Sequence, residues 1–374
     1  MFKIECLPAQ QGDAIWIEYG TIGAVHRVLI DGGTPATAPF VRQKIESLAP
    51  AERRLDLMVI SHVDTDHIGG ILKLLSNLPS GVQVDDVWFN AWPQIRNAKS
   101  SRLGPVDGEI LSTALGKLKW PWNAHFDGQA VMVASKGKPP QRRLRGGMTM
   151  TVLSPGQDQL AKLRAEWISV IQEAGLDPKN KDRWKKLLDA AAHRGVKSSI
   201  LGTPTIETLA QTKFNPDKAA ANGSTIALLA EFDQKVALLG GDSHAPVLLD
   251  AIGRLGRKPE AGKLDVDLFK VSHHGSAANV SSELLSAFTS PRYAFSTSGA
   301  VFGHPDGETV ARIMTLRSRA TKTLLFNYTE GTITKNYKKR KGRAPEWISG
   351  RIAREHGCAL QFPQDDTHGL VIEL

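Results

Sequence analysis

The chain has 374 residues, of which 41% are hydrophobic and 23% are charged, a composition typical of a globular protein with a sizeable core. It contains two cysteines, Cys6 and Cys358, so we expect no disulfide framework and a reducing, cytoplasmic location. No segment has the apolar length of a membrane span, and the N-terminus lacks the apolar core of a signal peptide, so we expect no association with a membrane.

The formal net charge of +9 favours an anionic partner such as a nucleic acid or a nucleotide. Much of the excess lies in three basic runs, at 136–145, 179–186 and 335–343. Trp184 and Tyr337 within the last two runs are candidate stacking partners for bases. Taken singly, each run is better explained as a solvated loop or helix face.

Strand and helix signals alternate along the first 155 residues. Short apolar runs or strict polar–apolar alternation predict strands at 2–7, 14–19, 28–33, 55–61, 84–89, 130–134 and 149–153. Apolar residues at helical spacing predict helices at 39–49 and 69–78. The run at 28–33 ends in a glycine pair, which predicts a tight turn there.

The middle of the chain differs, because residues 156–214 carry helical spacing with no strong strand signal between the helices. We interpret this segment as a helical insertion, which could also dock a partner protein. Strand signals then return at 224–232, 235–242, 267–272, 292–298, 323–328 and 369–374, with helices predicted at 246–255, 281–288 and 307–319. This mixed order predicts a layered α/β (α+β) fold, a single domain over 1–374 that ends in a basic segment and closing strand at 335–374.

The strongest chemical signal is SHVDTDHIGG at 61–70, which follows the predicted strand 55–61. It presents His62, Asp64, Asp66 and His67 in one loop, four side chains with lone pairs suited to a divalent metal. A solvated loop with an aspartate capping the next helix is the alternative, but four metal-capable residues at this spacing favour a metal site.

This pattern, H-x-D-x-D-H-x-G-G, resembles the metal-binding motif of the metallo-β-lactamase superfamily, with Asp64 in the position of its second histidine. The variant is similar to that in the hydrolase domain of the DNA-uptake protein ComEC and its stand-alone relatives. The resemblance implies an αββα four-layer sandwich. It also implies that Asp31, in the IDGG run at 30–33, buttresses the metal loop.

Three later segments extend the resemblance: the hairpin at 222–242 ending in Gly-Asp, KVSHHGS at 270–276 and FGHP at 302–305. They implicate Asp242 as a ligand shared by two metals, His273 and His274 as one ligand and one proton donor, and His304 as a further ligand. From spacing alone, Asp242 is as well explained as a helix cap. The implied metal ligands are His62, Asp64, Asp66, His67, Asp242, His274 and His304.

Two departures from the superfamily affect the metals. Asp64 supplies a hard oxygen in place of an imidazole, which shifts the preference towards manganese, with zinc as the alternative. The superfamily also has a histidine before the bridging aspartate, where this chain has Asn222 and Ser224. His193 would replace it only if the helical insertion folded over the centre.

These features predict a hydrolase in which two divalent ions, Zn or Mn, activate a water against a phosphodiester of nucleic acid or a nucleotide. Asp66 would orient the nucleophile, and whichever of His273 and His274 is not a ligand would protonate the leaving oxygen. The alternatives are a lactone or ester hydrolase, a nucleic-acid-binding module with a vestigial metal site, and a hydrolase subunit of a defence assembly.

Overall fold

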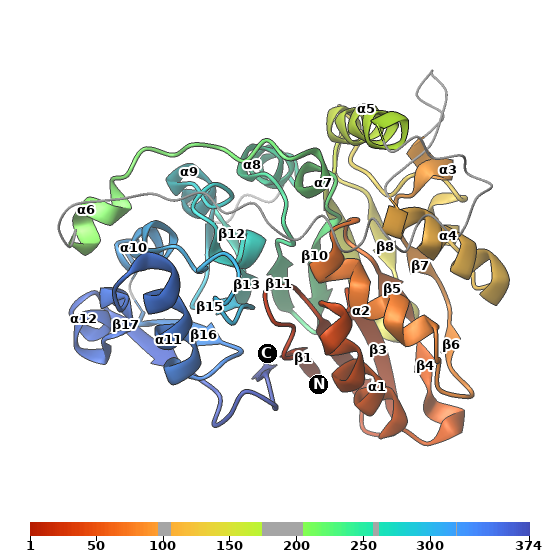
Figure 1. Cartoon of the computed structure of the whole chain (residues 1–374), viewed down its shortest axis with the longest axis horizontal. Helices are drawn as coiled ribbons and strands as arrows, with labels where there is room; N and C mark the ends of the chain where they lie inside the picture. Colours follow the sequence, from red (N-terminus) through yellow and green to blue (C-terminus); the bar gives the residue numbers. More distant parts are fainter. Residues whose placement is uncertain (96–105, 174–204, 257–261, 319) are drawn as a thin grey trace.

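The computed structural model describes residues 1–95, 106–173, 205–256, 262–318 and 320–374. Within them, a six-stranded and an eight-stranded sheet pack face to face, and helices cover the outer face of each (Figure 1). One apolar cluster fills the space between the sheets, and one lies under each helical layer. The fold is therefore the predicted αββα sandwich.

The six-stranded sheet has the order β18-β1-β2-β3-β5-β7. Its strands are β1 Phe2–Cys6, β2 Ile15–Thr21, β3 Ala24–Ile30, β5 Leu57–Val59, β7 Val87–Trp88 and β18 Leu370–Glu373. Strict alternation along β2 sends Ile15 and Ile17 into the cluster between the sheets and Trp16 into the cluster under the helices. The two chain ends meet in this sheet, since β1 pairs with β18 (Figure 1).

The eight-stranded sheet has the order β17-β16-β15-β13-β11-β10-β9-β8. Its strands are β8 Gln141–Arg143, β9 Thr149–Ser154, β10 Ala227–Phe232, β11 Lys235–Leu239, β13 Leu268–Lys270, β15 Arg292–Phe295, β16 Lys322–Phe326 and β17 Cys358–Gln361. The pairs from β11 to β17 are parallel, so the carboxyl ends of these strands share one edge. Two short parallel pairs lie outside the large sheets: β4 Arg54–Leu55 with β6 Gln83–Val84, and β12 Leu264–Asp265 with β14 Phe288–Thr289.

The helices divide between the two outer layers. Against the six-stranded sheet pack α1 Ala38–Glu46, α2 Thr65–Leu75, α3 Trp92–Ile95, α4 Val106–Leu118 and α5 Gln157–Glu173. Against the eight-stranded sheet pack α6 Ile206–Ala210, α8 Ala245–Gly253, α9 Ser282–Ser286, α10 Gly307–Met314, α11 Glu330–Lys341 and α12 Gly350–Glu355. The remaining turns of helix are α7 Ala220–Gly223, η1 Pro35–Thr37, η2 Pro50–Glu52, η3 Ala124–Phe126, η4 Arg145–Gly147, η6 Ser272–Gly275 and η7 Glu346–Ile348.

Several elements differ from the sequence predictions, and α4, α12, β8 and β17 were not predicted. The strand predicted at 130–134 is wrong: Val131 and Val133 are buried between the sheets, but this segment makes only an isolated bridge, between Val133 and Gly156. Helix α2 begins at Thr65, earlier than predicted, because the second half of the SHVDTDHIGG run at 61–70, which we call the metal loop, is itself helical. Helix α11 was not predicted, since within this very polar segment only Ile333 and Tyr337 are buried.

The predicted helical insertion at 156–214 is described only at its two ends. Leu160 and Leu163 of α5 belong to the apolar cluster between the six-stranded sheet and its helices. Ile206 of α6 belongs to the cluster between the eight-stranded sheet and its helices. The part between them, with the basic run 179–186, Trp184 and His193, lies outside the described residues. Among the described helices, none has both the length and the apolar content needed to cross a membrane.

Candidate metal centre

The candidate site lies where strands of both sheets end. The loop after β5 carries His62 and the first turn of α2 carries His67, while Asp242 follows β11 and His274 follows β13. All four side chains are buried, at 2% exposure or less. Residues more than 200 positions apart therefore meet because the carboxyl ends of their strands face one another across the sandwich.

Asp31, directly after β3, binds two residues of the metal loop and fixes its position. Its carboxylate accepts a hydrogen bond from the Ser61 backbone N–H at 2.7 Å and lies 2.8 Å from Nδ1 of His67. Because Nδ1 of His67 donates to this carboxylate, its Nε2 lone pair is directed into the centre. Asp31 thus occupies the buttressing position that the resemblance implied.

Glycines bring the loop close to its neighbours. A Cβ at Gly12 would lie 1.6 Å from the carbonyl oxygen of Asp66, and a Cβ at Gly70 would lie 1.8 Å from the carbonyl oxygen of Gly32. The sequence predicted a helix that starts at Gly69 and Gly70. In the structure both glycines lie inside α2, which begins at Thr65. Their role is to let α2 pack against the turn after β3.

Asp242 is the centre of the cluster. Its Oδ2 lies 3.2 Å from Nε2 of His67, 3.5 Å from Nε2 of His274, 3.6 Å from Nε2 of His273 and 3.9 Å from Nε2 of His62. The Nε2 atoms of His67 and His274 are themselves 3.3 Å apart. The N-cap of α8 is His244, so the alternative that Asp242 caps this helix is wrong.

The donor set fits a divalent metal. Among the described residues, Nε2 of His62 and Oδ1 of Asp242 are buried without a hydrogen-bond partner. Such atoms are costly in a folded protein unless a ligand satisfies them. One group of ligand atoms within 4.8 Å of one another comes from His62, His67 and Asp242, a second from Asp66, His67 and His274, and a third from Asp13, Asp242 and His274. Imidazole nitrogens with carboxylate oxygens suit zinc or manganese.

His273 and His274 differ in their surroundings. His274 is fully buried, and its Nδ1 lies 2.9 Å from the carbonyl oxygen of Ser296, so that N–H is donated there and Nε2 faces Asp242 as a ligand would. His273 is 21% exposed, and its Nδ1 lies 2.8 Å from Oδ1 of Asn279. His273 is therefore the histidine that a substrate can reach.

The electrostatics of the cluster are strongly coupled. Burial raises the pKa of Asp242, but His274, His67 and His273 outweigh burial and hold that pKa well below its usual value. Burial lowers the pKa of His67, yet Asp242 and Asp31 raise it well above the usual value. For His273, burial lowers the pKa, but Asp242 and hydrogen bonds to Asp217 and Asn279 raise it to about 9. Without a metal, protons on these imidazoles balance the carboxylates.

Sequence reasoning missed a buried ion pair beneath the site. Nζ of Lys270, at the end of β13, contacts Oδ2 of Asp13, and the exposure of these residues is 0% and 1%. Oδ1 of Asp13 lies 3.4 Å from Nδ1 of His274. The signal was present as a polar Gly-Asp before β2 and a lysine in an otherwise apolar strand, but pairing them required the tertiary structure.

The other predicted ligands lie nearer the surface. Asp64 is 45% exposed, with Oδ2 3.5 Å from Nε2 of His62. Asp66 lies in the first turn of α2 and belongs to one of the three ligand groups. His304 belongs to none of those found among the described residues; its ring lies 5.6 Å from that of His273, and its Nδ1 lies 3.4 Å from Asp306.

The position of the absent family histidine is occupied by Asn222 and Ser224, of which Asn222 lies beside His273. Nδ2 of Asn222 donates to Asp217 at 2.7 Å and lies 3.5 Å from Nδ1 of His273. The Ser224 hydroxyl donates to the carbonyl oxygen of Ala221. Neither belongs to the ligand groups found among the described residues.

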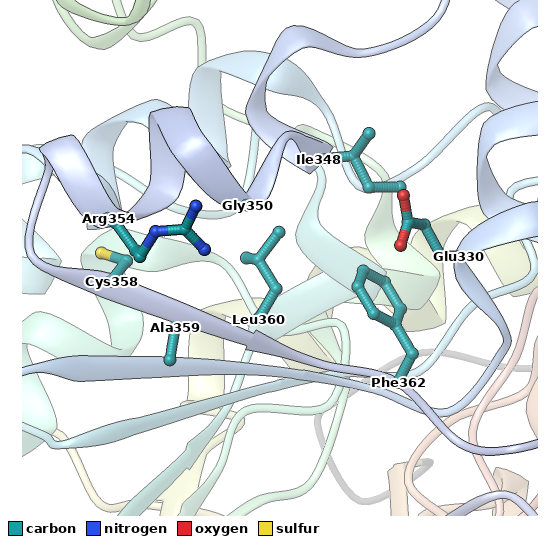
Figure 2. A pocket seen from close by; sticks show the side chains of 8 residues that line it. All are labelled: Glu330, Ile348, Gly350, Arg354, Cys358, Ala359, Leu360 and Phe362. Atoms are coloured by element: carbon teal, nitrogen blue, oxygen red, sulfur yellow. The ribbon is translucent and has the colours of Figure 1, made fainter.

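A separate pocket of about 300 Å³ lies between β17, α12 and the first turn of α11 (Figure 2). Apolar side chains line it together with the charged side chains of Arg354 and Glu330. None of its lining residues takes part in the metal centre, and it offers no comparable set of converging ligands. The lining residues are Glu330, Ile348, Gly350, Arg354, Cys358, Ala359, Leu360 and Phe362.

The αββα sandwich and the His/Asp cluster at the ends of its strands together define the class of metal-dependent hydrolases. The chain belongs to the metallo-β-lactamase superfamily, whose family model matches residues 8–205. No curated protein matches the sequence significantly.

Solved structures similar to this chain include three with low identity. A metallo-β-lactamase HARLDQ-motif mutant of Cronobacter sakazakii is 16% identical, covering 69% of this chain and 70% of that one, with a TM-score of 0.29. The metallo-β-lactamase-fold protein YhfI of Bacillus subtilis is 12% identical over 100% of both chains, with a TM-score of 0.34. CmlA, a diiron β-hydroxylase of Streptomyces venezuelae, is 12% identical over 100% of this chain and 54% of that one, with a TM-score of 0.38.

Proposed function

We propose that the protein is a phosphodiesterase of the ComEC-type subgroup, acting on nucleic acid or a nucleotide with two divalent metals, zinc or manganese. The observation that carries this proposal is the ring of four Nε2 atoms around Oδ2 of Asp242, at 3.2 to 3.9 Å. Divalent metals held there would lower the pKa of a bound water and polarise the phosphoryl oxygen.

The chain's own residues divide the work. His62, His67, His274 and Asp242 hold the metals, with Nδ1 of His67 and of His274 fixed by Asp31 and Ser296 so that both Nε2 lone pairs face inward. Asp66, in the same turn as His67, adds a carboxylate that binds metal and orients the nucleophile. In this proposal Asp64 and His304 bind from the rim of the site, outside the three ligand groups found among the described residues.

His273 supplies the leaving-group proton in this proposal. Its Nδ1 is held by Asn279 at 2.8 Å, its Nε2 faces the centre, and its side chain is 21% exposed. In the metal-free chain, burial lowers its pKa, but Asp242, Asp217 and Asn279 outweigh burial and raise the pKa to about 9. A protonated, partly exposed imidazole can donate to the departing oxygen of a phosphodiester.

The experiment that tests the proposal is a substrate panel: bis-p-nitrophenyl phosphate, single- and double-stranded DNA, RNA and a lactone, each with Mn²⁺ and with Zn²⁺. The wild type is compared with Asp242→Asn and with the matched control Asp233→Asn, an exposed turn residue of the same hairpin. We expect phosphodiester cleavage by the wild type and the control only. Cleavage of the lactone alone would contradict the proposal and support the ester hydrolase alternative.

A further inference from the structure

The C-terminal half of α11 lies against the loop 298–306 that carries His304. Nδ2 of Asn336 donates to the carbonyl oxygen of Ser298 at 2.8 Å, and Nε of Arg340 donates to that of Ala300 at 2.7 Å. A Cβ at Gly303 would lie 3.1 Å from Cβ of Arg340, so helix and loop are in close contact. The basic end of the helix is therefore fixed beside the metal centre.

The charge on this end of α11 is largely unneutralised. Its last turn contains Lys338, Lys339, Arg340 and Lys341 in succession, and all four are exposed. Lys341 pairs with Asp306 at 3.2 Å, but no ion pair found in the described part of the chain involves the other three. A helix C-terminus favours a cation, yet three adjacent ones without a carboxylate repel one another. Such a cluster suits a polyanion.

An exposed aromatic ring stands on the loop that Arg340 contacts. Phe302 is 48% exposed, one of few large apolar residues in the described part of the chain that face solvent, and its ring centroid lies 5.8 Å from that of His304. His304 in turn lies 5.6 Å from His273, whose Nε2 is 3.6 Å from Asp242. Contacts thus run without a break from Phe302 to the metal centre.

Tyr337, the stacking partner suggested by the sequence, does not have this role. It is 8% exposed and packs edge-on against Trp347 in the apolar cluster between the eight-stranded sheet and its helices. Among the described residues near this helix, the exposed aromatic ring is that of Phe302, which lies in a different segment and meets the basic run only in the folded chain.

We propose that single-stranded nucleic acid binds beside the metal centre to a surface that we call the α11 rim. This surface consists of Phe302, Lys338, Lys339 and Arg340. A base stacks on Phe302, while the cations contact the phosphates that flank it. An unpaired strand is required because a duplex hides its base faces. This inference rests on the proposed phosphodiesterase function, and it defines the substrate as a strand that extends from His273 across His304 to α11.

The test measures binding apart from catalysis. A fluorescein-labelled oligothymidylate of about 12 nucleotides is titrated into metal-free Asp242→Asn protein by fluorescence anisotropy at several salt concentrations. Three further variants in that background are compared: Phe302→Ala, the double change Lys338→Glu/Lys339→Glu, and the matched control Lys117→Glu/Lys119→Glu near the end of α4. Circular dichroism and thermal melting establish that each variant is folded.

We expect the α11 double variant to reduce the slope of log Kd against log salt by about 1.4, or about 0.7 per lost phosphate contact. Phe302→Ala should weaken binding about tenfold without changing that slope, because it removes stacking and no charge. The α4 control should keep the wild-type slope. Equal effects of the two double variants, an inert Phe302→Ala, or tighter binding of a duplex would each overturn the proposal.

The two proposals fail in different ways. Binding that shows the expected pattern, together with no cleavage of bis-p-nitrophenyl phosphate by the wild type, contradicts the phosphodiesterase and leaves the binding surface in place. Cleavage of that small substrate without selective binding at the α11 rim contradicts the surface alone.

Discussion

Replacing Lys270 by methionine tests whether the buried ion pair beneath the metal centre positions His274. Lys270 and Asp13 are exposed by 0% and 1%, so solvent does not screen their interaction. Methionine keeps most of the volume but leaves the Asp13 carboxylate buried without its cation. Breaking a buried pair in this way costs about 3–5 kcal/mol, so Lys270→Met should lower the free energy of unfolding by that amount at pH 7.

The deficit should depend on pH in a defined direction. In the wild type, burial raises the pKa of Asp13, but Lys270 and then His274 outweigh burial and hold it below the usual value. The pair therefore stabilises the fold above the unfolded-state pKa, and this contribution is lost as pH falls through the lower folded-state pKa. In Lys270→Met the largest contribution that lowers the pKa of Asp13 is lost, so this pKa rises above its wild-type value and protonation relieves part of the penalty. The difference from the wild type should shrink between pH 7 and pH 5.

The assay is urea denaturation of chelator-treated protein at pH 7 and pH 5, with Asp13→Asn/Lys270→Met as the matched double variant. The double variant should regain much of the lost stability, because no charge is left buried alone. Metal affinity of Lys270→Met should fall about 10- to 100-fold, since Asp13, which lies 3.4 Å from Nδ1 of His274, then loses the cation that fixes its position. A single variant within about 0.5 kcal/mol of the wild type, or a deficit independent of pH, would refute this reasoning.

Three further predictions concern the metal loop, the metal ligands and a distant carboxylate. Gly12→Ala should cost about 1–3 kcal/mol and weaken metal binding, because its Cβ would lie 1.6 Å from the carbonyl oxygen of Asp66; an unchanged melting temperature would contradict this. Mn²⁺ or Zn²⁺ at 100 times its Kd should stabilise the wild type by about 2.7 kcal/mol and Asp242→Asn far less, as measured by thermal melting; no shift in the wild type would remove the basis for a metal site. Burial raises the pKa of Asp86, but hydrogen bonds from His125 and Ala124 outweigh burial and hold this pKa below its usual value. The carboxylate therefore stabilises the fold above a pH of about 4. Asp86→Asn should therefore lower stability by about 1.5–3 kcal/mol at pH 7, and its difference from the wild type should narrow below that pH in denaturant titrations.

The sequence by itself determined the layered fold and most of the chemistry. Alternating apolar residues specify buried strands, and the dense spacing of His62, Asp64, Asp66 and His67 after one such strand is informative without any tertiary contact. The segments around Asp242, His274 and His304 were found through resemblance, and the fold then placed them at one edge of the sandwich.

Only the tertiary structure decided how side chains are directed at the centre. His273 and His274 are adjacent, and both have a left-handed backbone, with φ of 47° and 54°. Their different roles follow from partners in other segments, Asn279 for one and Ser296 for the other. No local pattern encodes such contacts, since ring orientation depends on the acceptor that each Nδ1 meets in the folded chain.

The same reason explains the pairing of Lys270 with Asp13 and the exposure of Phe302 beside α11. The composition of the chain shows an excess of positive charge, and its sequence pattern shows a polar segment at 335–343. Tyr337 is turned away from solvent because the side of α11 that carries Ile333 and Tyr337 is buried. Phe302 is exposed because it lies on a separate loop. Sequence determined which groups this protein has for its chemistry, whereas packing decided which of them meet.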